Sequence, residues 1–159
     1  MSNDDARPGA DIFEGIGLVA ATSSVLESAV LNLHEMLLAS PRGHKVVAGE
    51  QFAVAYQAIL HLSSDLDEDL RARVKAAATS AHEAWNKRGK VIHGKWHLGS
   101  HGEVEPGRSA LVSNRKRGGT QLAIWSAAKL LKLNCELIEA TREVQAVTLE
   151  VYKTDNLIK

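Results

Sequence analysis

Two apolar stripes run through the last third of the chain at helical spacing, and they limit the possible folds more than any other feature. The first stripe consists of Ile124, Ala128, Leu131, Cys135 and Ile138, and the second of Leu130, Leu133, Leu137, Val144, Val147 and Val151. Steps of three and four residues predict a helix from about 121 to 152. Its apolar surface is broader than one neighbouring helix can cover, which indicates a central helix or a dimer interface.

Three earlier segments carry the same helical period. One helix is expected from Asp11, a good N-cap residue, to the breaker that contains Pro41. Glycines 15 and 17 predict irregular first turns there. A second helix is expected over about 47–62 and a third from about Asp67, whose apolar stripe continues through Trp85 to Arg88 and Ile92. Arg88 is therefore expected at the margin of a buried face.

Composition and cysteine count predict one soluble domain. The chain has 159 residues, 45% hydrophobic and only 4% aromatic, a profile that favours helices over a β-sandwich. Residues 1–10 are expected to form a disordered tail, and residues 11–159 a single helical domain. The single cysteine, Cys135, indicates a reducing compartment and is expected to be a buried small hydrophobe. With no signal peptide and no apolar run long enough to cross a bilayer, a cytoplasmic protein without a membrane partner is expected.

The segment between Gly94 and Gly119 has no helical period and contains six glycines and one proline. It is longer than a typical connection between helices, and such insertions often form lids or binding loops. Within it, residues 95–98 and 110–113 could pair as a short β-hairpin. The predicted fold is therefore all-α, a four- to five-helix bundle with a glycine-rich insertion between the third and fourth helices.

Positive charge is concentrated in and before this insertion. Residues 87–117 carry eight Lys and Arg against two Glu, a net charge of +6, and the formal net charge of the whole chain is zero. The remainder therefore carries −6. A basic segment on an acidic body can guide a polyanion to one place.

The basic segment contains one pair of residues suited to chemistry on phosphates, Arg88 and His93. Histidine is suited to proton transfer near neutral pH, and arginine offers a charged, planar fork for phosphate. On a continuous helix the two residues would be separated by about 7.5 Å of rise and about 140° of rotation. They could meet at one phosphate if Gly89 or Gly94 helped to break the helix, or if a second copy of the chain completed the site.

The stretch from Arg88 to Trp96, Arg-Gly-Lys-Val-Ile-His-Gly-Lys-Trp, resembles the Arg-x4–6-His motif of the HEPN superfamily. The common form is Arg-Asn-x-aliphatic-aliphatic-His-Gly, often followed by a Trp. The chain departs from it at Gly89, where the family usually has a polar residue, and Asn86 could stand in for that residue. The motif covers about twelve residues, and the order of helices extends the resemblance to most of the chain.

The resemblance implies a HEPN-like bundle that dimerises and places two Arg-His pairs in a shared cleft. It further implies a metal-independent endoribonuclease of toxin or defence type, without a cofactor, which cleaves RNA by 2′-hydroxyl attack. RNA and a cognate antitoxin or regulatory protein would be its partners. His93 would act as general base or acid and Arg88 would stabilise the transition state. Candidates for RNA binding are Asn86, Lys90, Lys95, Trp96, Arg115, Lys116 and Arg117, with Trp96 able to stack on a base.

Three other interpretations of these residues remain open. Arg88 and His93 could merely cap the third helix, in a HEPN-like module that binds RNA, nucleotides or a protein without catalysis. The basic run that begins at Arg115 could be a solvated turn. His93, His97 and His101 could bind zinc together with Glu103 or Glu105 and form a hydrolase, although the glycines around them disfavour a continuous helix.

Overall fold

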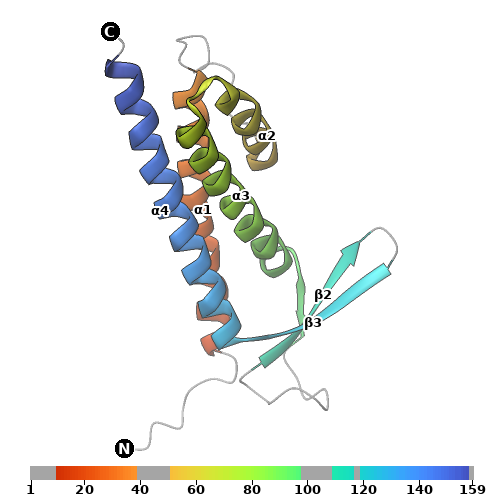
Figure 1. Ribbon diagram of the computed structural model, residues 1–159. Helices are drawn as coiled ribbons and strands as arrows, with labels where there is room; N and C mark the ends of the chain where they lie inside the picture. Colours follow the sequence, from red (N-terminus) through yellow and green to blue (C-terminus); the bar gives the residue numbers. More distant parts are fainter. Residues whose placement is uncertain (1–9, 39–50, 98–108, 117–118, 158–159) are drawn as a thin grey trace, which may run out of the picture. The chain divides into compact units, whose positions relative to one another are not determined.

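The computed structural model of the protein describes residues 10–38, 51–97, 109–116 and 119–157 (Figure 1). Most of these residues are helical, and the others include one small antiparallel sheet, so the predicted helical chain with a hairpin before the last helix is confirmed at this level. The elements, in order, are α1 (Ala10–Leu38), α2 (Phe52–Leu62), the short 3-10 helix η2 (Ser63–Asp65), α3 (Glu68–Ile92), β1 (Lys95–His97), β2 (Ser109–Lys116), β3 (Gly119–Ser126) and α4 (Ala127–Leu157).

The observed helix boundaries follow local signals in the sequence. Asp67 caps α3, because its carboxylate Oδ1 accepts a hydrogen bond of 3.0 Å from the backbone N–H of Leu70. α1 is helical from Ala10 onward, so the irregular first turns predicted from its two glycines are not observed. α2 begins at Phe52, and the part of the second predicted helix that precedes Gln51 lies outside the described residues.

The described residues belong to two compact units. One unit comprises residues up to Thr22 together with Asn86–Glu136, and it contains the sheet and every residue of the candidate site. The other comprises Ser23–Trp85 and Leu137–Lys159.

The second unit has a helical core with a stacked group of rings. Phe52 of α2 lies parallel to Trp85 of α3, with ring centroids 4.3 Å apart and planes 2° apart. Tyr56 stacks on His82 at 4.1 Å and 11°. Stacking of aromatic rings adds to the gain from burying the rings themselves. Trp85 and His82 therefore have packing roles, as the stripe pattern predicted for Trp85.

In the first unit, α1 and α4 approach each other closely at a glycine. A Cβ atom added to Gly15 would lie 2.9 Å from both Cβ and Cδ1 of Leu130. One turn of α4 further on, Oγ1 of Thr22 donates a hydrogen bond of 2.6 Å to Oδ1 of Asn134. Because Gly15 has no side chain, Leu130 of α4 packs directly against the backbone of α1.

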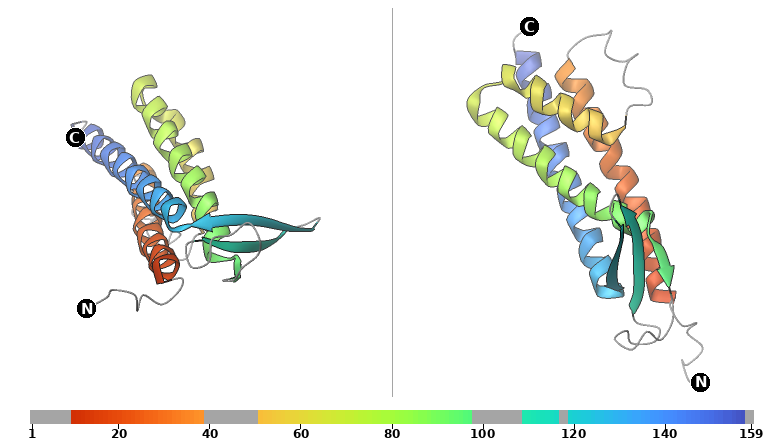
Figure 2. Two further views of the ribbon diagram at one scale, coloured as in Figure 1. Left: turned by 90° about the horizontal axis from the view of Figure 1, so that it is seen from below. Right: turned by 90° about the vertical axis from the view of Figure 1, so that its right-hand side faces the viewer.

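The three strands form a sheet in the order β1-β2-β3, with both pairs antiparallel (Figures 1 and 2). β1 pairs with β2 through Trp96 and Val112, which confirms the hairpin expected from the sequence. β3 corrects the sequence prediction, because residues 121–126 form a strand and α4 begins only at Ala127. Trp125, which falls within the helix predicted from about 121, therefore lies on β3, opposite Ala110.

α4 buries only one of its two apolar stripes. Leu130, Leu137 and Val144 are fully buried, whereas Leu131 is 57% exposed. Cys135 is exposed as well, so the expectation of a buried cysteine is wrong. It is wrong because the sequence shows that both stripes are apolar but not which one meets a neighbour. The uncovered stripe matches the surplus apolar surface predicted for this helix.

α1 is long and apolar enough to cross a membrane by length and composition alone. Its most apolar 18-residue window has a mean hydropathy of 1.5, and 33% of that window is buried. The expectation that no segment has this length and apolar content is therefore wrong. Mostly buried core helices of soluble proteins and signal sequences near an N-terminus both meet the same criterion, and Ile12, Leu26 and Leu33 of α1 are fully buried. α1 thus contributes one face to the protein interior.

Candidate functional site

The candidate site lies at the C-terminal end of α3. The helix continues without interruption through Gly89 to Ile92, and the chain bends at His93 and Gly94 before β1 begins. The backbone N–H of His93 still donates to the carbonyl of Gly89, at 3.2 Å, so helical bonding reaches His93 itself. Of the two glycines considered as helix breakers, Gly94 lies at the break and Gly89 does not.

This geometry keeps Arg88 and His93 about one and a half helical turns apart along one chain. Arg88 is half-buried, which confirms its predicted place at the margin of the buried face, and His93 is exposed. Unbroken helix over Arg88–Ile92 directs the two side chains to different sides of α3. The arrangement in which a broken helix brings both residues of one chain to one phosphate is therefore not the one observed.

Four of the other predicted contact residues lie on the last turns of α3 or directly after them on β1. Asn86, Lys90 and Lys95 are exposed, and Trp96 is half-buried on β1. Arg115 and Lys116 belong to β2, opposite Thr120 and Gly119 of β3. Arg117 lies outside the described residues. The end of α3 and the start of β1 thus carry three exposed lysines and one exposed histidine within about ten residues of sequence.

Two contacts tie the helix end to the rest of its unit. Nζ of Lys87, the residue before Arg88, lies 2.9 Å from Oε2 of Glu136 on α4. The indole Nε1 of Trp96 donates a hydrogen bond of 2.9 Å to the carbonyl of Val91, a residue that is fully buried. Sequence reasoning gave neither contact, because both depend on which elements lie beside α3.

The histidines considered as a zinc site do not form one within the described residues. His93 and His97 are both exposed, and Nε2 of His97 lies 3.3 Å from Oγ of Ser113 on β2. Among the residues described, no three His, Cys, Asp or Glu side chains lie close enough to share a metal ion. His101, Glu103 and Glu105 lie outside the described residues.

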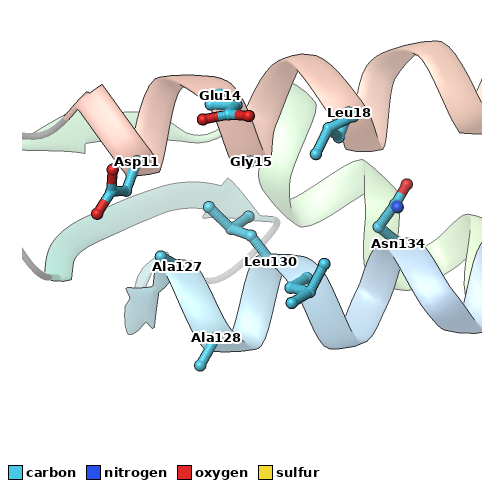
Figure 3. A pocket seen from close by; sticks show the side chains of 9 residues that line it. Asp11, Glu14, Gly15, Leu18, Ala127, Ala128, Leu130 and Asn134 are labelled. Atoms are coloured by element: carbon cyan, nitrogen blue, oxygen red, sulfur yellow. The ribbon is translucent and has the colours of Figure 1, made fainter.

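A cavity of about 270 Å³ lies elsewhere in the same unit, between the first turns of α1 and α4 (Figure 3). Its wall is mostly apolar and carries the carboxylates of Asp11 and Glu14 from α1. Figure 3 shows Leu130 projecting from α4 toward α1 at Gly15. Neither Arg88 nor His93 lines this cavity, so it is separate from the candidate site.

No protein-family model matches the sequence, and neither the curated proteins nor the solved structures yield a match.

Proposed function

We propose that the protein is a metal-independent endoribonuclease of HEPN type that works as a homodimer. The observation that carries this proposal is the exposed His93 at the end of α3, one and a half turns after a half-buried Arg88 and among exposed lysines. The Arg-x4-His-Gly motif and the cationic surroundings support RNA as substrate, since phosphate contacts from Lys and Arg dominate affinity for nucleic acid.

The proposed reaction needs only proton transfers and charge stabilisation. One His93 removes the proton from a ribose 2′-hydroxyl, whose oxygen attacks the adjacent phosphorus. The bond to the 5′-oxygen breaks, the leaving oxygen takes a proton from water, and the protonated His93 returns its proton to the solvent. Arg88 stabilises the additional negative charge on the phosphoryl oxygens. The products are a 2′,3′-cyclic phosphate and a 5′-hydroxyl.

The direct test is to incubate the purified protein with RNA in the presence of EDTA. Cleavage should persist, and mass spectrometry should identify 2′,3′-cyclic phosphate ends. Cleavage that EDTA abolishes would contradict the proposal and favour a metal-dependent hydrolase. Binding of RNA without cleavage would favour the non-catalytic module, an alternative that the departure from the family motif at Gly89 supports.

Restoring the polar residue at Gly89 should increase activity. A Cβ atom at Gly89 meets nothing within 4 Å, and the position is helical, so the backbone and the space at Cβ both accept a side chain. If the side chain that usually follows the arginine helps to orient substrate, Gly89→Asn should raise the cleavage rate roughly three- to tenfold, as expected for one added hydrogen bond. The measurement is the single-turnover rate on an RNA oligonucleotide.

Gly89→Ala is the matched control for this substitution. It should stabilise the protein by about 0.5–1 kcal/mol through helix propensity alone and leave the cleavage rate unchanged. Equal rates for the asparagine and alanine variants would show that the polar group has no role in this chain.

A further inference from the structure

The end of α3 leaves backbone carbonyls without helical partners, and one of them accepts a hydrogen bond from a side chain. In a longer helix the carbonyl of Val91 would accept a hydrogen bond from the N–H of Lys95. Lys95 instead begins β1. The indole Nε1 of Trp96 donates to the Val91 carbonyl at 2.9 Å. A side-chain N–H from the strand therefore takes the place of the missing backbone N–H of the helix.

Both ends of this hydrogen bond are anchored in the unit. The acceptor residue, Val91, is fully buried on α3. The donor residue, Trp96, pairs on β1 with Val112 of β2, which is fully buried as well. The right-hand view of Figure 2 shows α3 passing directly into the sheet at this point. The bond therefore joins the buried end of α3 to the first strand of the sheet.

His93 lies within the short loop that this bond closes. Four residues, 92–95, separate Val91 from Trp96 along the chain, and His93 is the second of them. On its N-terminal side it is held by its own N–H, which donates to the Gly89 carbonyl at 3.2 Å. On its C-terminal side, the loop ends at Trp96, whose indole N–H donates to the Val91 carbonyl. The imidazole remains exposed while the backbone that carries it is held at two points.

We propose that Trp96 is a positioning residue of the candidate site. Its indole N–H fixes the backbone turn that carries His93, and we call this hydrogen bond to the Val91 carbonyl the clamp. The effect of the clamp on cleavage rests on the proposed function, whereas the clamp itself does not. Proton transfer depends steeply on the placement of the catalytic group, so a looser turn lowers the catalytic rate. The role differs from base stacking, which would use the ring face and act on substrate binding.

Trp96→Phe separates these two roles, because phenylalanine keeps an aromatic face and lacks the N–H donor. Trp125→Phe is the matched control, since it makes the same change at another half-buried tryptophan of the same sheet. Hydrogen exchange of the His93 amide should accelerate about three- to tenfold in Trp96→Phe, the effect of one lost hydrogen bond, and remain unchanged in Trp125→Phe.

The kinetic measurement is the split between kcat and KM on an RNA oligonucleotide. In Trp96→Phe, kcat should fall about tenfold or more while KM stays constant, as for the loss of an interaction made in the transition state. A raised KM with unchanged kcat would overturn the proposal in favour of stacking. Unchanged His93 exchange would overturn the clamp.

Failure of the proposed function and failure of the clamp give different results. If the wild-type protein does not cleave RNA but His93 exchange still accelerates in Trp96→Phe, the proposed function fails and the clamp stands. If Trp96→Phe does not fold, the sulfur analogue of tryptophan, 3-benzothienylalanine, is placed at position 96 instead. It has the shape of the indole without the N–H, so accelerated exchange at His93 supports the clamp and unchanged exchange overturns it.

Discussion

His93→Ala should reduce RNA cleavage by about a hundredfold to ten-thousandfold, the usual contribution of a general acid or base. The side chain is exposed at the end of α3, so its removal leaves no cavity. The free energy of unfolding should change by no more than about 0.5 kcal/mol, as for most surface substitutions. Single-turnover cleavage of an RNA oligonucleotide and urea unfolding followed by circular dichroism measure the two effects.

His97→Ala is the matched control, because His97 is an exposed histidine four residues away on β1. It should cleave RNA at the wild-type rate. If His93→Ala cleaves as fast as the wild type, or if both alanine variants lose activity equally, His93 is not the acid or base of this protein.

Arg88→Ala should cause a loss of about a hundredfold to a thousandfold, the typical effect of removing one group that stabilises transition-state charge. Arg88→Lys should recover only part of the activity, because an ammonium group cannot make the two parallel hydrogen bonds of a guanidinium group. Full recovery with lysine would reduce the role of Arg88 to that of a simple positive charge.

A mixture of the Arg88→Ala and His93→Ala chains tests whether two copies share one site. Each mixed dimer would hold one intact arginine and one intact histidine on opposite chains. If these form a working pair across the interface, random exchange should restore about a quarter of the wild-type activity, since half the dimers are mixed and each holds one complete pair. No recovery in a verified mixed dimer would contradict the composite site.

Gly15→Ala should destabilise the protein by about 1–2 kcal/mol. The added methyl group would lie 2.9 Å from Cβ and Cδ1 of Leu130, so α1 or α4 must shift. Overpacking of this kind costs about 1–3 kcal/mol, and the better helix propensity of alanine offsets up to about 1 kcal/mol of it. Urea unfolding of the full chain measures the difference.

Gly17→Ala provides the control on the same helix. A Cβ atom at Gly17 meets nothing within 4 Å, so only helix propensity acts there, and the variant should gain about 0.5–1 kcal/mol. A Gly15→Ala variant as stable as Gly17→Ala would show that α1 and α4 are not in close contact at Leu130.

Local patterns account for the elements that the sequence predicted correctly. Apolar periodicity indicated all four helices, and Asp67 marked the start of α3 through its capping bond. The hairpin between β1 and β2 followed from two short segments of strand type on either side of a turn. Arg88, His93 and their basic neighbours were selected as candidates because their order along the chain carries the chemical signal, and their role in cleavage stays a prediction.

The misjudged elements depended on partners distant in sequence. Residues 121–126 fit the start of a helical stripe, yet they form β3 because β2 supplies a full ladder of partners from Ser109 to Lys116. Burial of Leu137 and exposure of Cys135 follow from which face of α4 meets its neighbours. A pattern of apolar residues cannot distinguish two apolar faces of one helix.

The sequence by itself therefore determined the helices and the candidate catalytic residues, because helical period and residue chemistry are properties of short stretches of chain. Only the tertiary structure decided how His93 is held. The bond from the Trp96 indole to the Val91 carbonyl forms because β1 pairs with β2 and brings the indole back to the helix end. Such a contact results from sheet pairing and burial, which no local pattern in the sequence specifies.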